Sequence, residues 1–266
     1  MTPNILFEDS VVLVVDKPAG LVVNRAESVK EPTLQDWVIN NFQFSIFNFQ
    51  DGITEFEKRS GIVHRIDKET SGVLLVAKTP EAFVELQRQF KEREIEKTYI
   101  ALVHGKFERE QGVINASVGR LPWNRERFGI LPGGREAETR YKVVKNYDKV
   151  ASSAYELRIK NNGRDKAHNS LFKIHDSYSL VEFYPKTGRT HQIRVHAKYL
   201  HHALVSDTFY AGRKTSRRDR EWCPRLFLHA AKISFTHPET KERVVIESLL
   251  PGDLQSALSH LGGVNP

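Results

Sequence analysis

Cysteine is almost absent from this sequence of 266 residues, which contains only Cys223. A single cysteine excludes an internal disulfide and a cysteine-rich zinc site. No apolar run approaches the roughly 18 residues of a membrane-spanning helix, and the first residues lack the basic and then apolar pattern of a secretory signal. We therefore expect a cytoplasmic protein without membrane contact, in which Cys223 is a packed thiol rather than a nucleophile.

Acidic residues are outnumbered: 33 Asp and Glu stand against 40 Lys and Arg, a net charge of +7. A basic protein without membrane features commonly binds a polyanion. The densest basic stretch holds Arg213, Arg217 and Arg218 beside Tyr210 and Trp222. Cations next to exposed rings suit phosphate contact and base stacking. The stretch is therefore predicted to bind nucleic acid, although a basic surface can also serve solubility alone.

Residue patterns predict a strand-rich chain with few helices. Strands are expected at 5–8, 11–16, 73–77, 97–105, 112–118, 137–146, 154–160 and 178–184, with 21–24 also extended. Helices are expected at 34–41, from 80 onward, at 191–200 and at 254–261, while 119–134 and 161–169 are predicted loops. Thr79, Thr190 and Asp253 are the predicted caps of the last three helices. The phenylalanines spread between 42 and 56 are interpreted as plugs under a long loop.

A charged turn, residues 64–72 with the sequence HRIDKETSG, runs directly into the apolar strand 73–77. Asp67 lies two residues after Arg65 and immediately before Lys68. Neighbouring cations favour an ionised carboxylate, which suits a nucleophile or a base better than a general acid. An aspartate that caps a turn with its side chain is the alternative interpretation.

Residues 64–72 resemble the HRLDxxTSG signature of RNA pseudouridine synthases of the RluA type, with Ile66 in place of leucine. Other motifs of that family stand in the same order. Residues 16–24 resemble KPxGLxV, residues 97–105 resemble KxYxAxVxG, and residues 188–196 match GRTHQIRVH at every position. The resemblance extends over roughly residues 5–250 and moves the interpretation of Asp67 towards catalysis.

The resemblance implies that Asp67 is the catalytic residue, that Arg194 pairs with it, and that Tyr99 lies against the target base. From the residues alone, without the match to the motif, Tyr99 is interpreted as a half-buried strand aromatic. Substrate contacts are predicted for the apolar wall, the catalytic turn and the basic segments: Leu228, His64, Arg65, Thr70, Arg120, Arg213, Arg217 and Arg218. Arg65 is expected to fill the space that a flipped nucleotide vacates.

The fold implied by the resemblance is α+β, with a long, mixed, mainly antiparallel sheet, flanking helices and loops, and a central cleft. We expect one domain over 1–266 without the N-terminal S4-like RNA-binding module of some relatives. The implied reaction converts uridine to pseudouridine in rRNA or tRNA and requires no cofactor or metal. The expected partner is RNA, and the protein is expected to be a monomer without an obligatory protein partner.

One family motif departs from its pattern. The usual LGxPIxGDxxYG reads LHHALVSDTFYAG at 200–212, so that His201 and Ser206 replace two glycines. If those glycines have positive φ, the turn is strained here or rebuilt. A metal site built from His191, His196, His201 and His202 is disfavoured by their spacing and by the lack of an acidic ligand.

Two rival functions remain from the sequence. A non-catalytic RNA-binding or ribosome-assembly factor fits the same fold, but it has little need of Asp67, Tyr99 and Arg194 together. A phosphotransferase is suggested by residues 64–67, but the chain lacks the glycine-rich loop and metal motif of such enzymes. Whether Asp67 acts as nucleophile or as base stays open.

Overall fold

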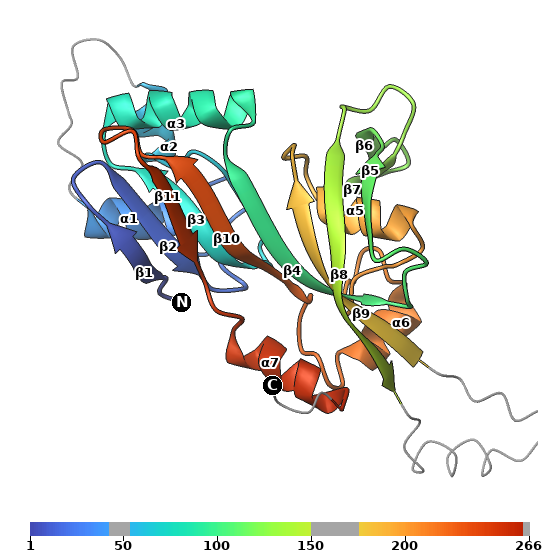
Figure 1. The fold of residues 1–266 in the computed structure, drawn as a ribbon. Coiled ribbons are helices and arrows are strands. Elements are labelled where there is room, and N and C mark those ends of the chain that lie inside the picture. Colours follow the sequence, from blue (N-terminus) through green and yellow to red (C-terminus); the bar gives the residue numbers. More distant parts are fainter. Residues whose placement is uncertain (43–53, 150–175, 263–266) are drawn as a thin grey trace, which may run out of the picture.

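The computed structural model describes residues 1–42, 54–149 and 176–262, and most of its strands form one nine-stranded sheet (Figure 1). The sheet order is β1-β2-β3-β10-β4-β9-β8-β5, with β11 paired to β10, while β6 and β7 form a separate hairpin. The strands are β1 (Asn4–Glu8), β2 (Val12–Lys17), β3 (Ser71–Ala77), β4 (Glu96–His104), β5 (Gln111–Asn115), β6 (Val118–Leu121), β7 (Asn124–Ile130), β8 (Glu138–Lys149), β9 (Asp176–Pro185), β10 (Leu228–Thr236) and β11 (Arg243–Glu247). The helices are α1 (Leu34–Asn41), α2 (Glu55–Arg59), α3 (Pro80–Glu92), α5 (Gln192–Tyr199), α6 (Arg213–Asp219) and α7 (Gly252–His260).

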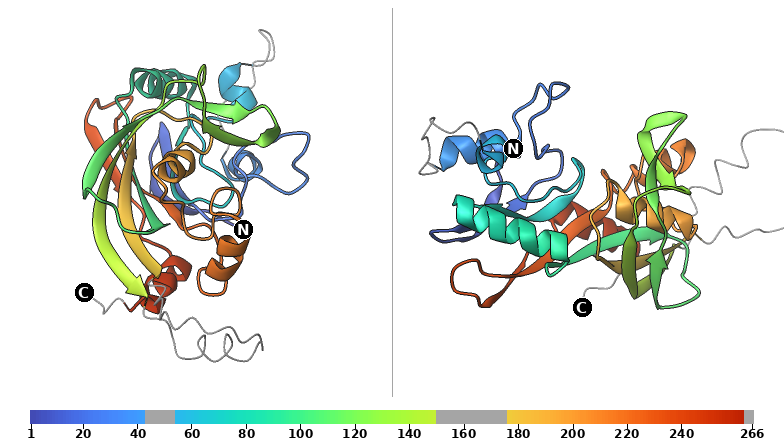
Figure 2. Two further views of the ribbon diagram at one scale, coloured as in Figure 1. Left: turned by 90° about the vertical axis from the view of Figure 1, so that its right-hand side faces the viewer. Right: turned by 90° about the horizontal axis from the view of Figure 1, so that it is seen from above.

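The predicted α+β class with a long, mainly antiparallel sheet is confirmed. Strands β3 and β10 are parallel, whereas the other pairings described are antiparallel. Strand β4 lies in the middle, between β10 and β9. Strands β4, β9 and β8 curve around α5, which lies on their concave side (Figure 2). None of the helices in the described ranges is long and apolar enough to cross a membrane.

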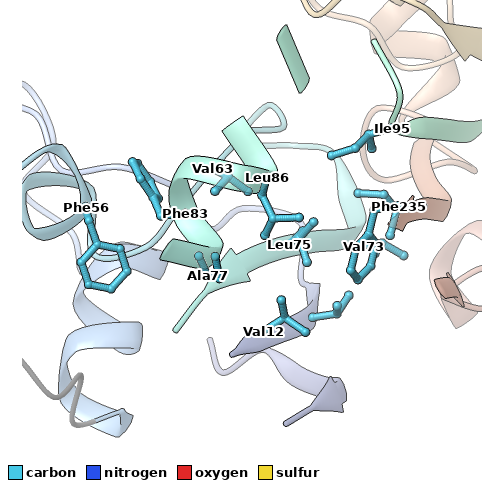
Figure 3. Close-up of a cluster of buried hydrophobic side chains, with 13 residues drawn as sticks. Val12, Phe56, Val63, Val73, Leu75, Ala77, Phe83, Leu86, Ile95 and Phe235 are labelled. Atoms are coloured by element: carbon cyan, nitrogen blue, oxygen red, sulfur yellow. The ribbon is translucent and has the colours of Figure 1, made fainter. Parts of the chain in front are cut away.

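Strand β3 is buried on both faces, as its apolar run predicts. Side chains alternate across a strand, so Val73 and Leu75 pack with α3 while Leu74 packs on the opposite side with α1. The α3 side consists of Phe83, Leu86 and their neighbours from β2 and β10 (Figure 3). These two cores fix the strand that directly follows the charged turn.

Two of the three predicted helix caps are wrong. Thr79 does cap α3, accepting a hydrogen bond from the Ala82 N–H at 3.2 Å. Helix α5, however, starts after His191, which adopts a left-handed φ of 56° and makes no side-chain cap, so Thr190 lies outside the cap position. Helix α7 starts after Pro251, and the carboxylate of Asp253 instead binds Arg225.

Other differences come from polar or irregular segments. Residues 119–134, predicted as a loop, contain the hairpin β6–β7, whose arginine-rich strands carry little apolar alternation. Residues 21–24 are not a strand, because the carbonyls of Val22 and Val23 accept N–H groups from the start of α1. Phe56 is buried against Phe83, as the plug interpretation predicts. The predictions for 154–160 and 161–169 and for Phe44, Phe47 and Phe49 lie outside the described residues.

The two positions where glycine is replaced keep the backbone of glycine. His201 and Ser206 have φ values of 65° and 61°, a region that costs an L-residue roughly 1–2 kcal/mol. Buried Ser206 is held there by its own hydrogen bonds, from its N–H to Asp219 at 3.0 Å and from its hydroxyl to the Cys223 carbonyl at 2.6 Å. Cys223 is a packed thiol, as predicted, and burial raises its pKa to about 11.

Candidate active site

The Asp67 turn leads into β3 and is held by two kinds of backbone contact. The Thr70 N–H donates to the Asp67 carbonyl at 3.1 Å and closes the turn. Gly72 then follows at a φ of 113°, where a Cβ atom would lie 2.2 Å from the Ala230 carbonyl oxygen. Only glycine allows β3 to lie this close to β10, so this residue fixes where the turn ends and the buried strand begins.

The N-terminal KPAG turn anchors the Asp67 turn from the other side. The buried ammonium of Lys17 donates to the carbonyls of Pro18, Leu21 and Lys68 at 2.9, 2.9 and 3.2 Å. The Gly20 N–H also donates to the Lys68 carbonyl, at 2.7 Å. Burial lowers the pKa of Lys17 to about 7, and the charge of Asp67 opposes that fall. These contacts give residues 16–24 a structural role, because they hold the backbone of the Asp67 turn in place.

Arg194, on α5, joins two carboxylates. Its Nη1 lies 3.1 Å from Oδ2 of Asp67, the predicted contact, while its Nε and Nη2 hold both oxygens of Asp207 at 2.7 and 2.9 Å. Asp207 is fully buried and also accepts the N–H groups of Phe209 and Tyr210. A bidentate guanidinium has one preferred orientation, so Asp207 aims Arg194 at Asp67. Sequence reasoning missed Asp207, although it stands within the same motif as the replaced glycines.

Tyr99 and Leu228 complete the walls around Asp67. Tyr99 lies at the centre of the sheet, on β4 opposite Phe183 of β9 and Ala230 of β10. Burial, and then the charge of Asp67, raises the pKa of Tyr99 above its ordinary value, so its phenol stays protonated. Leu228 is buried at the start of β10 and lines the same cavity.

The cavity over Asp67 has a volume of about 570 Å³, and Asp67 is the one carboxylate among its described lining residues. Nine lysine and arginine side chains also line it: Arg59, Arg65, Lys91, Arg93, Lys97, Arg135, Lys186, Arg189 and Arg194. Most of these residues are dispersed through the sequence, so no local cluster of charge reveals them. The cavity combines one carboxylate with a strongly cationic surround.

The predicted substrate contacts divide into two groups. His64, Arg65, Thr70 and Leu228 line the cavity. Arg120, Arg213, Arg217 and Arg218 do not, and they lie on β6 and α6. The ring of Tyr210, assumed exposed beside the basic stretch, is buried. The ring turns inward, away from the basic stretch, and packs with β6 and α5 residues.

His64 and Thr70 contribute in different ways. Nε2 of His64 accepts the Leu75 N–H at 2.9 Å, and burial lowers the pKa of this imidazole to about 3. That nitrogen therefore ties the turn to β3 and has no lone pair left for a substrate. The Thr70 hydroxyl is buried without a hydrogen-bond partner among the described residues.

The two ring nitrogens of His196 bond within the protein, Nδ1 with the Thr139 hydroxyl and Nε2 with the Ala116 carbonyl. No cluster of residues suited to a metal occurs in the described ranges.

Lys97 is held in the cavity at a cost in stability. Burial alone lowers its pKa to about 8. A lysine whose pKa falls on folding destabilises the protein fully below its folded pKa, and the cost disappears as pH rises towards the unfolded value of 10.5. We expect Lys97→Met to raise the free energy of unfolding by about 1–3 kcal/mol at pH 7, with the gain vanishing between pH 8 and 10.5. Urea unfolding at several pH values measures this; Lys91→Met, at an exposed cavity position, is the control expected to show no such gain.

Comparisons with known proteins agree on one family. A family model described as RNA pseudouridylate synthase matches residues 11–199. The chain is 35% identical over 96% of its length to the ribosomal large subunit pseudouridine synthase D of Nitrosomonas europaea, and spans 64% of that protein. It is 35% identical over 99% of its length to an uncharacterized RNA pseudouridine synthase of Aquifex aeolicus, and spans 74% of it. The fold resembles human RNA pseudouridylate synthase domain containing 1, with a TM-score of 0.66 and 24% identity over 96% of this chain and 87% of that one.

Proposed function

Because this chain belongs to the RNA pseudouridylate synthase family, we propose that it isomerises uridine to pseudouridine in RNA with Asp67 as the reacting carboxylate. The observation that carries the proposal is the cavity itself: one carboxylate, held by Arg194 at 3.1 Å, surrounded by cations. A volume of about 570 Å³ lies within the roughly 300–1,000 Å³ typical of small-molecule sites. A flipped nucleotide fits such a space.

The reaction breaks the C1′–N1 bond of uridine, rotates the detached uracil, and joins C1′ to C5. C5 then loses its proton to solvent while N1 takes one up, so that the product is an isomer of the substrate. Asp67 acts either by bonding to C1′ or by removing a sugar proton. In both cases the bonding pair leaves with the uracil. Arg194 orients the carboxylate, because its guanidinium is itself fixed by buried Asp207.

Tyr99 and Arg65 are assigned to the handling of the base. The ring of Tyr99 lines the cavity from the sheet, where it packs against the uracil while no bond holds it. Arg65 is exposed at the same cavity and replaces the extruded nucleotide in the RNA, since a stacked uridine must leave its helix to reach Asp67. The alternative of a non-catalytic RNA-binding factor is not favoured by the family or by this set of side chains.

We propose large-subunit rRNA as the substrate, because relatives from Nitrosomonas europaea and Neisseria meningitidis carry that target in their names. The test is release of tritium from unmodified transcripts made with [5-³H]uridine. Release from a large-subunit rRNA transcript and none from tRNA transcripts is the expected result. Release from tRNA alone contradicts the substrate, and release from neither contradicts the activity.

Binding of this rRNA is expected to depend strongly on salt. Each phosphate that a cavity cation neutralises releases counterions. We expect affinity to fall by at least about 10²-fold between 50 and 200 mM salt. Lys91→Gln, in the cavity lining, is expected to reduce the magnitude of the slope of log K against log [salt] by about 0.7–1. Lys30→Gln makes the same charge change outside the cavity and should leave the slope unaltered. Equal slopes for wild type, Lys91→Gln and Lys30→Gln would contradict a cationic RNA site in this cavity.

A further inference from the structure

His191 occupies an unusual place beside the reacting carboxylate. It lies at the N-cap position of α5 with a left-handed φ of 56°, but its side chain makes no capping hydrogen bond. Its imidazole lines the cavity, and Nε2 lies 3.9 Å from Oδ2 of Asp67. A residue in a strained conformation without a capping function is held there by its surroundings. The roles assigned above to Asp67, Arg194 and Tyr99 leave this side chain unused.

Hydrogen bonds on the far side of the ring determine its tautomer. The Phe128 N–H, in β7, donates to the hydroxyl oxygen of Tyr210 at 3.1 Å. That hydroxyl is 2.9 Å from Nδ1 of His191. That oxygen accepts the amide, and Nδ1 is the acceptor that the described residues offer to its own proton, so we assign the hydroxyl as the donor of this bond. A neutral imidazole that accepts at Nδ1 carries its hydrogen on Nε2.

The ring is also fixed in direction. Phe128, Phe209 and Tyr210 surround it with ring centroids 5.6 to 5.7 Å away. Burial lowers the pKa of His191, against the opposing charge of Asp67, so the neutral form is the one present at pH 7. The Nε2–H edge is therefore the part of the ring that faces Asp67 and the cavity.

We propose that His191 is a further catalytic residue, whose Nε2–H donates a hydrogen bond to an oxygen of the departing uracil while Tyr210 and the Phe128 amide hold its tautomer. The inference rests on the proposed function. When the C1′–N1 bond breaks, its electron pair leaves with the base, and the negative charge spreads over N1 and the two carbonyl oxygens. The Nε2–H of His191 stabilises that charge and keeps its proton. His191 therefore transfers no proton, whether Asp67 bonds to C1′ or removes a sugar proton.

The distance suits this role. A reacting carbon sits about 3–3.5 Å from the group that attacks it. The 2-oxygen of the base is joined through one ring carbon to N1, which C1′ carries. A donor 3.9 Å from the Asp67 oxygen therefore also lies near the 2-oxygen of the bound base. Donors aimed at developing charge in this way are typically worth about 10²–10³ in rate.

Two substitutions separate donation from support of the backbone. Asparagine tolerates the left-handed conformation and reaches Tyr210, but its amide is too short to donate at the Nε2 position. Glutamine strains the backbone more but extends an amide N–H towards that position. If His191 donates a hydrogen bond to the base, His191→Gln should release tritium faster than His191→Asn. If His191 only supports the backbone, the order of the two rates should be reversed.

The measurement is single-turnover tritium release from the large-subunit rRNA transcript. We expect His191→Asn to lose about 10²-fold in rate, with RNA affinity changed by less than about threefold. His191→Gln should remain within about tenfold of wild type. His201→Asn is the matched control, an exposed histidine in the same left-handed region of φ, expected to keep the wild-type rate. Equal rates for wild type and His191→Asn, or a loss of affinity alone, would overturn the proposal.

Tyr210→Phe tests the relay. Without the hydroxyl the imidazole is free to change tautomer, and the rate should fall about 3- to 10-fold in the wild-type background but less than about twofold when combined with His191→Gln. Long-range ¹H–¹⁵N NMR of the free protein reads the tautomer directly, with the His191 signal assigned by its loss in His191→Gln. A hydrogen found on Nδ1 overturns this inference even when wild type releases tritium. Absence of tritium release by wild type is instead a failure of the proposed function, and the tautomer remains measurable.

Discussion

Replacing Asp67 with asparagine is expected to reduce pseudouridine formation by more than about 10⁴-fold while the protein still folds and binds RNA. The amide is nearly isosteric with the carboxylate, but it can neither bond to C1′ nor accept a sugar proton. Arg194 keeps its bidentate partner Asp207, so its orientation does not depend on residue 67. Tritium release, thermal unfolding and RNA affinity are measured on the same preparation.

Glu69→Gln is the matched control for Asp67→Asn. Glu69 lies in the same turn, but its carboxylate points out to Arg220 at 2.8 Å, and it is not among the lining residues of the cavity. We expect the control to retain activity within about threefold. Tritium release by Asp67→Asn at a rate close to that of wild type would show that another group performs the reaction.

Replacing Arg194 with methionine is expected to lower the free energy of unfolding by about 3–5 kcal/mol and also to abolish most activity. The guanidinium is 4% exposed and Asp207 is fully buried. Loss of the cation therefore leaves a charge inside the protein without its partner, which costs more than the lost ion pair itself. Asp67 loses its oriented partner in the same step.

Urea unfolding of three variants checks this explanation. Arg194→Met combined with Asp207→Asn removes both buried charges, and the amide oxygen of the introduced asparagine can still accept the N–H groups of Phe209 and Tyr210. We expect the double variant to recover at least about half of the lost stability. Arg88→Met breaks an exposed ion-pair cluster around Arg88 of α3 and should leave the free energy of unfolding close to that of wild type. A single Arg194→Met variant as stable as wild type would contradict a buried, obligatory pair.

Elements with a strong local pattern were predictable from the sequence. The apolar run of β3 and the Thr79-Pro80 start of α3 depend on neighbouring residues alone, and both are present. The hairpin β6–β7 and the left-handed start of α5 were not predictable. Polar strands in a hairpin lack apolar alternation, and no pattern of neighbouring residues predicts the left-handed φ of His191.

The site divides in the same way. Asp67, Tyr99 and Arg194 could be named because each stands in a motif that resembles a known family. Asp207 and His191 also stand in such motifs, but the roles proposed for them follow only from contacts, with Arg194 in one case and with Tyr210 and the Phe128 amide in the other. Arg213, Arg217 and Arg218 form a dense run of positive charge along the chain. The structure nevertheless places them outside the lining of the cavity.

The order of residues by itself determined the family and the buried strand behind the Asp67 turn, and it singled out Asp67 as the carboxylate proposed to react. These follow from short-range chemistry, in which apolar runs, caps and motif spacing act within a few residues. Only the tertiary structure decided which cations surround that carboxylate, which buried acid aims its guanidinium partner, and which imidazole nitrogen faces it. Those outcomes depend on distances between side chains far apart in the chain, and burial there makes each charge and each hydrogen bond count for more than it does in water.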